Sequence, residues 1–237
     1  MKPQDSIKFG ATEIGYDIVY SDKIKRARLS VSPPRKVEVT VPSDIDRISI
    51  QKIVRRKAAW VIKQMFKYDQ IVGPTSIKEY VNGETFLYLG RQYRLKFNKN
   101  KTNMPVCLSG KYLEIKYSET KGVTKKQVIQ WYRNQAMLKI NESVNCYSKK
   151  LGIKSPQISV KNQLKRWGSC TSKNSLIFNY KIIMAPVSQL EYIVAHELCH
   201  IKEKNHTPRF WLMLKAIMPD YNKRKNELMK DGWKYSL

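Results

Sequence analysis

The clearest sign of chemical function in this chain is a group of histidine and glutamate residues at a defined spacing. Its only three histidines are His196, His200 and His206, and Glu197 follows the first of them. A His-Glu-x-x-His pattern is expected by chance in roughly two of a thousand chains of this composition, so the spacing is informative. Residues i and i+4 share one face of a helix, where His196 and His200 can hold one metal ion between their imidazoles. His206 can offer a third nitrogen if the chain leaves the helix and turns.

Three protein ligands and one open position are typical of a catalytic zinc site, whereas a structural site closes with four ligands. Zn²⁺ held in this way would lower the pKa of a bound water molecule towards about 7. Glu197 lies about 100° round the helix from His196 and about 60° from His200, so its carboxylate can take a proton from that water. We therefore expect a metal-dependent hydrolase with Glu197 as general base. The alternative is an ordinary helix with three surface histidines.

The third ligand has a competing candidate. If the helix extends far enough, Glu203 falls within about 20° of His196 on the helical wheel. Its carboxylate could bind the metal, accept a hydrogen bond from a ligand imidazole, or be solvated. We favour His206 as the ligand, because the chain has no other histidine and Pro208 fixes its position.

Turn and capping signals place the three histidines on a helix-loop-helix unit. Ala185-Pro186 interrupts the chain, and Ser188 to Glu191 has the pattern of a capping box, so the first helix is expected to begin near Gln189. Thr207-Pro208 is typical of an N-cap followed by proline at the first helical position. His206 is therefore expected just before the start of the second helix.

A β-hairpin is expected immediately before the metal-binding helix. Its strands are predicted within Gln163 to Cys170 and Ser175 to Tyr180, on either side of a polar turn. The second strand is expected to flank the cleft, where an exposed edge could bind an extended peptide by strand addition. Lys161, Lys165 and Arg166 precede the turn and could bind a phosphate or carboxylate, or form an ordinary basic surface.

The rest of the chain predicts an α+β protein. Alternating apolar residues indicate strands between Ile14 and Val41 and again between Thr85 and Tyr117. A helix capped by Ser43 is expected to run to about Ile71 and to end at Gly73-Pro74. A long amphipathic helix is expected from Thr124 to Leu151.

These elements predict two lobes. The N-terminal lobe, residues 1–118, is β-rich and has one long helix. The C-terminal lobe, residues 119–237, carries the histidine helix and the preceding hairpin. The sequence shows no internal repeat, and its 237 residues are ample for a core in each lobe.

Composition and charge indicate which partners and which cellular location to expect for the protein. Lysine and arginine number 45 against 19 acidic residues, a net charge of +26. This excess favours anionic partners such as nucleic acid, a nucleotide polyphosphate or an acidic protein, although a generic basic surface would also account for it. No apolar run is long enough to span a membrane and no signal peptide begins the chain, so we expect a cytoplasmic protein with no membrane partner. The four cysteines form no Cys-x-x-Cys pair and are expected to be reduced thiols.

Several motifs together resemble the YgjP-like family of metal-dependent hydrolases. In chain order they are Arg166-Trp167-Gly168-Ser169-Cys170, Asn179, Ala185-Pro186, His196-Glu197-Leu198-Cys199-His200, Asn205-His206 and Phe210-Trp211. Lys23 to Val31, Trp60 to Lys63 and Asn82 to Leu95 are similar to the N-terminal segments of the family. The resemblance thus covers nearly the whole chain. Metzincins share the spacing of three histidines but have glycine where this chain has Glu203.

The resemblance implies a gluzincin-like minimal zincin as the C-terminal lobe and assigns roles to residues. The implied zinc ligands are His196, His200 and His206, and the implied general base is Glu197. The residues of these motifs that are candidates for substrate binding are Arg166, Trp167, Ser169 and Asn179.

For function, the resemblance implies a zinc metallopeptidase that acts on a peptide or protein. One branch of the family is described as a nucleoside triphosphate (UTP) pyrophosphatase, which would suit the positive charge. The similar SprT and WLM families are linked to DNA–protein crosslink proteolysis, and family genes often lie beside type I restriction systems. The alternatives are therefore a metal-dependent UTP pyrophosphatase and a nucleic-acid-associated binding module with a structural zinc.

Overall fold

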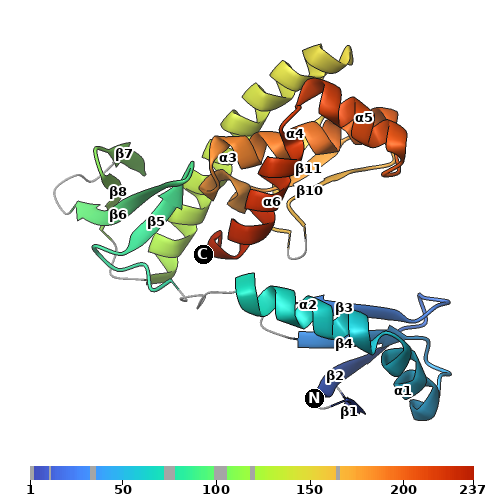
Figure 1. The fold of residues 1–237 in the computed structure, drawn as a ribbon. Helices are drawn as coiled ribbons and strands as arrows, with labels where there is room; N and C mark the ends of the chain where they lie inside the picture. The colour runs from blue at the N-terminus through green and yellow to red at the C-terminus, as the bar shows by residue number, and fades with distance from the viewer. Residues whose placement is uncertain are drawn as a thin grey trace. The chain divides into compact units, whose positions relative to one another are not determined.

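The chain divides into two compact units, residues 1–75 and 76–237, and each is described by itself. The computed structural model describes residues 3–10, 12–32, 36–71, 78–98, 106–117, 121–163 and 166–237 (Figure 1). The expected helix stop at Gly73-Pro74 and the candidate anion contact Lys165 lie outside these residues. Within them the fold is α+β, with three small sheets and six α-helices.

The first unit is a four-stranded sheet packed against two helices. The strands, in spatial order, are β1 (Gln4–Phe9), β2 (Thr12–Tyr20), β4 (Lys36–Val41) and β3 (Arg28–Ser32). β2 and β4 run parallel, and the other two pairs are antiparallel. Alternate side chains of β2 and β4 are buried, as expected for a sheet with one covered face. The covering helices are α1 (Arg47–Arg56) and α2 (Ala58–Ile71).

The single helix expected from Ser43 is instead two helices that start later. The Asp46 carboxylate accepts a hydrogen bond from the Ser49 backbone N–H at 3.1 Å and so caps α1. The Ser43 hydroxyl is bonded to the Asp22 carboxylate and does not cap the helix. Lys57 then leaves helical geometry, which ends α1 before α2 begins.

The second unit opens with a sheet of the same topology as the first. Its strands, in spatial order, are β5 (Thr85–Tyr88), β6 (Arg91–Asn98), β8 (Tyr112–Lys116) and β7 (Cys107–Ser109). β6 and β8 run parallel, so two hairpins again join through their second strands, and a helix again follows. The topology therefore repeats although the sequence shows no repeat, because many residue combinations satisfy the same alternation of buried and exposed positions.

The remainder of the second unit holds the histidines. It comprises α3 (Lys121–Leu151), β9 (Ile158–Lys161), β10 (Gly168–Cys170), β11 (Leu176–Asn179), the 3₁₀ helix η1 (Tyr180–Met184), α4 (Val187–Lys202), α5 (Pro208–Ile217), α6 (Tyr221–Asp231) and η2 (Gly232–Lys234). The expected hairpin is formed by β10 and β11, but η1 separates it from α4. β9 also pairs with β11, in parallel, so β11 is the central strand and has no free edge for a peptide. The edge strand beside α4 is β10.

One hydrophobic core joins the β5–β8 sheet to α3 and α4. Phe86, Leu95 and Leu113 belong to the same buried cluster as the inward residues of both helices. The Tyr132 hydroxyl of α3 donates to the Leu87 carbonyl of β5 at 2.6 Å. The two units therefore have other bounds than the expected lobes of 1–118 and 119–237, because the second sheet buries its apolar face against the C-terminal helices.

The start of α4 differs from the expected capping box. The N-cap is Pro186, which makes no side-chain cap, and Ser188 already lies in the first turn. The Glu191 carboxylate does not return to the helix start, because it accepts hydrogen bonds from Arg224 at 2.6 Å and from the Tyr147 hydroxyl at 3.4 Å. These bonds tie α4 to α6 and α3.

The β5–β6 turn is attached to the segment before α4. The backbone N–H groups of Leu89 and Gly90 donate to the carbonyls of Ile183 at 2.8 Å and Met184 at 3.0 Å. Gly90 has a φ of +79°, and a Cβ at this position would lie 2.9 Å from Cγ of Pro186. Only glycine therefore allows the turn to approach the start of α4 this closely.

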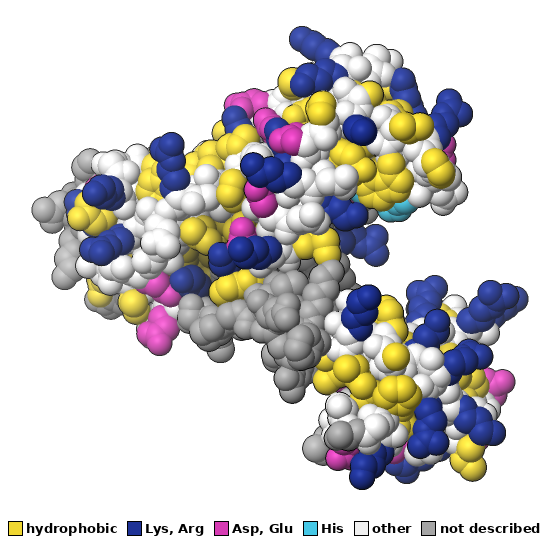
Figure 2. All heavy atoms as spheres, in the orientation of Figure 1, with side chains coloured by type: hydrophobic (Ala, Val, Ile, Leu, Met, Phe, Trp, Pro, Cys, Tyr) yellow, Lys and Arg dark blue, Asp and Glu magenta, His cyan; other side chains and the backbone are white. Residues whose placement is uncertain are grey.

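Basic side chains are spread widely over both units. On the face shown in Figure 2, lysine and arginine side chains are scattered and not gathered in one patch. All four cysteines are free thiols, as expected. Of the helices in the described part of the chain, none has the length and apolar character needed to cross a membrane.

Gly90→Ala is expected to destabilise the second unit more than Gly83→Ala. Both glycines have positive φ, so each substitution costs about 1 kcal/mol for the backbone. A Cβ at Gly83 meets nothing within 4 Å, whereas one at Gly90 meets Pro186, which adds about 1–3 kcal/mol. Urea unfolding of both variants measures the difference. An equal loss of unfolding free energy in the two variants would show that the close approach of the turn to Pro186 does not affect stability.

Candidate metal centre

Helix α4 is buried on most sides and carries two of the histidines. Nine of its residues are buried, including Glu197, while His196 and His200 are partly exposed. The expected start of α5 is confirmed, because the Thr207 hydroxyl accepts from the Phe210 N–H at 3.4 Å and Pro208 occupies the first helical position. His206 therefore lies directly before α5, held by the helix that follows it.

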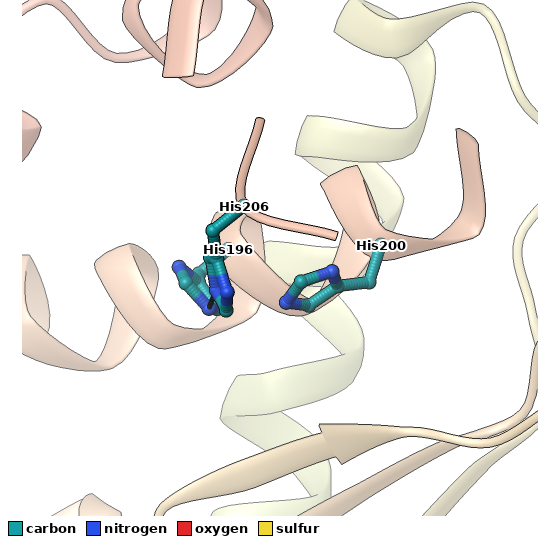
Figure 3. Close-up of side chains that lie close together, drawn as sticks. All are labelled: His196, His200 and His206. Carbon is teal, nitrogen blue, oxygen red and sulfur yellow. Dashed lines mark hydrogen bonds between the residues drawn. The ribbon is translucent and has the colours of Figure 1, made fainter. Parts of the chain in front are cut away.

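The three imidazoles converge on one point. Their ligand-capable nitrogens all lie within 4.8 Å of one another (Figure 3). Nε2 of His196 and Nε2 of His206 are 3.0 Å apart. Nδ1 of His200 lies 3.0 Å from the Glu203 carbonyl, which can only accept, so Nδ1 donates this hydrogen bond and Nε2 is the ring nitrogen left for a metal ion. Glu203 thus acts on His200 through its backbone and is absent from the nitrogen cluster.

These nitrogens fit a divalent metal ion. Tetrahedral zinc with Zn–N bonds of about 2.0–2.1 Å holds its nitrogen ligands about 3.4 Å apart, close to the separation of His196 and His206. Burial first, and then the neighbouring histidines, lower the pKa of His196 to about 3, so its ring is neutral as a metal ligand must be. The pKa of His206 is also lowered, mainly by burial. Nδ1 of His196 is buried without a hydrogen-bond partner among the described residues.

An aromatic cluster surrounds the imidazoles. The ring of Phe210 is fully buried, and its centre lies 4.6–5.0 Å from the centres of all three imidazoles. Trp211 stacks on His206 at 5.4 Å with an interplanar angle of 25°. These two aromatic residues are part of the family motif, and the sequence did not predict their contact with the histidines. Their positions, four and five residues after His206, were the available signal.

The Glu197 side chain packs against the backbone of β10. Its side chain is buried, and burial raises the pKa of the carboxyl to about 7. A hydrogen bond from the Cys170 backbone N–H and the positive charge of Arg166 oppose this rise. A Cβ at Gly168 would lie 2.7 Å from Cγ of Glu197 and 3.0 Å from Oε1. The glycine therefore gives the carboxylate its space.

The family is decided by a match over most of the chain. The model of the YgjP-like metallopeptidase domain matches residues 25–231. The chain belongs to the YgjP-like family. A metallopeptidase of this family requires a metal cofactor, and the cluster of His196, His200 and His206 could hold one. The motif resemblance that the sequence indicated is confirmed.

Two solved structures are similar to part of this YgjP-like chain. The metallopeptidase zymogen of Pyrococcus abyssi abylysin is 16% identical, covers 38% of this chain and 91% of its own length, and has a TM-score of 0.36. The metallopeptidase zymogen of Methanocaldococcus jannaschii jannalysin is 25% identical, covers 38% of this chain and 87% of its own length, and has a TM-score of 0.35. Comparison with curated proteins gave no match.

Two of the candidate substrate-binding residues of this YgjP-like chain lie near Glu197. Arg166 is exposed and close enough for its charge to act on the Glu197 carboxyl. Ser169 lies between Gly168 and Cys170 on β10, so its side chain points to the other face of the strand. There it contacts the Gln163 amide at 3.5 Å.

The other two candidates are engaged within the fold. Trp167 packs edge-to-face on Tyr235, with ring centres 5.9 Å apart. The Asn179 amide donates to the carbonyls of Gln163 at 2.7 Å and Arg166 at 3.4 Å, and its oxygen accepts from the Lys181 N–H. Asn179 therefore holds the backbone at Gln163 and at Arg166. Contact of Trp167 or Asn179 with the substrate stays a prediction.

His206→Ala is expected to weaken zinc binding by at least about 100-fold, because one of three nitrogens is lost. Glu203→Gln is the matched control, since its backbone carbonyl still orients His200. Competition with a chromophoric chelator measures both affinities. Equal affinity in the His206 variant and the native protein would exclude His206 as a ligand.

Gly168→Ala is expected to lower peptidase activity about 10- to 100-fold while zinc affinity stays unchanged. The added methyl group displaces the Glu197 carboxylate but touches no histidine, and a shift of about 1 Å is sufficient for such a loss. Gly15→Ala is the control, because Gly15 is also a strand glycine but has open space. Full activity in the Gly168 variant would contradict the proposed constraint on Glu197.

Proposed function

We propose that this chain is a zinc metallopeptidase in which His196, His200 and His206 hold the metal and Glu197 is the general base. The observation that carries the proposal is the convergence of three imidazoles beside a buried carboxylate. The family match to a metallopeptidase domain supports the same activity. The substrate is accordingly a peptide or protein.

The role of Glu197 follows from its surroundings. Bound zinc would supply Lewis-acid activation of a water molecule. The Glu197 carboxylate receives the proton of the attacking water and passes it to the departing amine. Its pKa near 7 suits both transfers, because the group can gain and lose a proton near neutrality. The contacts with Gly168 and Cys170 hold the carboxylate in position during both proton transfers.

The strand β10 offers a place for the peptide. Within the described residues it pairs with β11 on one side only, so its other edge can bind an extended backbone. Arg166 precedes this strand, and its positive charge suits a carboxylate or carbonyl of the substrate. The peptide would thus lie along the strand that holds Glu197, with its carbonyl groups near the metal.

The two alternatives from the sequence have less support. The family model names a peptidase domain and supports neither a nucleotide pyrophosphatase nor a nucleic-acid-binding module. A structural zinc would need a fourth protein ligand, and the cluster found in the described part of the chain has three histidines.

Glu197→Gln is expected to keep zinc affinity and lower peptide hydrolysis by about 10²- to 10⁴-fold, because the amide cannot accept the proton. The matched control is Glu203→Gln, whose hydrolysis should equal that of the native protein. Turnover is measured with casein-derived peptides as substrates, with and without a chelator. Hydrolysis of nucleoside triphosphates is assayed in parallel under the same conditions. Full turnover by the Glu197 variant would remove it as base. Chelator-sensitive cleavage of nucleoside triphosphates alone would overturn the peptidase assignment.

A further inference from the structure

A lysine lies above the aromatic stack that supports His206. The indole of Trp211 on α5 is stacked with His206 and also with Tyr221, which is 5.6 Å away at 21°. Nζ of Lys225 lies 4.8 Å from the centre of the same indole. Tyr221 and Lys225 are four residues apart on α6, so both project towards Trp211 from one helical face.

No residue in the part of the chain that the structure describes neutralises the charge of Lys225. Its neighbour Arg224 takes up the nearby carboxylates, with bonds to Asp220 at 2.8 Å and to Glu191 at 2.6 Å. No ion pair or hydrogen bond joins Lys225 to another residue of the described chain, where its contact is the Trp211 ring. An ammonium group has three donors, so this one keeps donors for a ligand.

Lys225 is also close to the metal position. Its ammonium lies 4.8 Å from the centre of the Trp211 indole, and that indole stacks on His206 with ring centres 5.4 Å apart. Arg166 is exposed two residues before β10, the strand whose Gly168 lies against the Glu197 side chain. Two cations therefore flank the site from different elements.

We propose that Lys225, held over Trp211 beside Tyr221, binds an acidic side chain of the peptide substrate next to the metal position. This inference rests on the proposed peptidase function and names its substrate class. A single ammonium suits one carboxylate, and the aromatic faces can cover the methylene groups of a glutamate side chain. A triphosphate is bound by several converging donors or backbone N–H groups. Among the described residues of α6, Lys225 is the cation that lies over Trp211.

The test measures binding separately from cleavage. Zinc-loaded Glu197→Gln protein is titrated with fluorescent peptides that are identical except for Glu, Gln or Lys at each position in turn, at low salt. At one position the Glu peptide is expected to bind about tenfold more tightly than the Lys peptide. Adding Lys225→Glu should reverse that preference, so that the Lys peptide binds more tightly. The loss of preference in high salt would accompany an ion pair.

The control changes the same charge on another face of the same helix. Lys223 is exposed on α6 and two residues from Lys225, so it points away from Trp211. Lys223→Glu in place of Lys225→Glu should leave the preference for Glu intact. All three proteins should still bind one equivalent of zinc.

Three results would overturn the inference. They are equal binding of Glu and Lys peptides at every position, a preference that Lys225→Glu leaves unchanged, and a preference that Lys223→Glu removes equally. Tighter binding of a nucleoside triphosphate than of the Glu peptide, lost in the Lys225 variant, would also overturn the peptide assignment. Failure of the proposed function looks different, because the unsubstituted Glu197 protein would then cleave no peptide whatever the binding preference.

Discussion

Helix α4 has nine buried residues, and two partly exposed imidazoles and one buried carboxylate project from it. Polar groups taken out of water are costly unless they are paired, and burial accordingly keeps His196 neutral and raises the pKa of Glu197. Backbone groups relieve part of this cost, through the Cys170 N–H and the Glu203 carbonyl. A cation between the histidines would relieve the rest, so the burial of α4 and the proposed metal chemistry depend on each other.

Three segments from different parts of the chain meet this helix and define its exposed face. β10 places Gly168 against Glu197, the start of α5 presents His206, and α6 brings Lys225 over Trp211. The β5–β6 turn holds the segment before α4 through its hydrogen bonds to η1. Because each segment is fixed by its own core contacts, the side chains of the centre are held before any ligand arrives.

Local patterns predicted the parts of this centre that depend on local geometry. The spacing of His196 and His200 fixes a shared helical face, and Thr207-Pro208 fixes the start of the next helix. The capping box at Ser188 was wrong, because Glu191 finds a stronger partner in a helix distant in sequence. The approach of β10 to Glu197 and the size of the units likewise depend on which surfaces pack together, and no local spacing encodes that.

The proposed activity depends on a metal held by three histidines with one coordination position left open. X-ray absorption at the zinc edge, on protein loaded with one equivalent of zinc, tests this most directly. The spectrum should show three imidazole nitrogens at about 2.0–2.1 Å and one further light atom not supplied by the chain. Added hydroxamate should replace that atom and leave the three nitrogens in place. A shell of four protein ligands, or any bound cysteine sulfur at about 2.3 Å, would contradict the account.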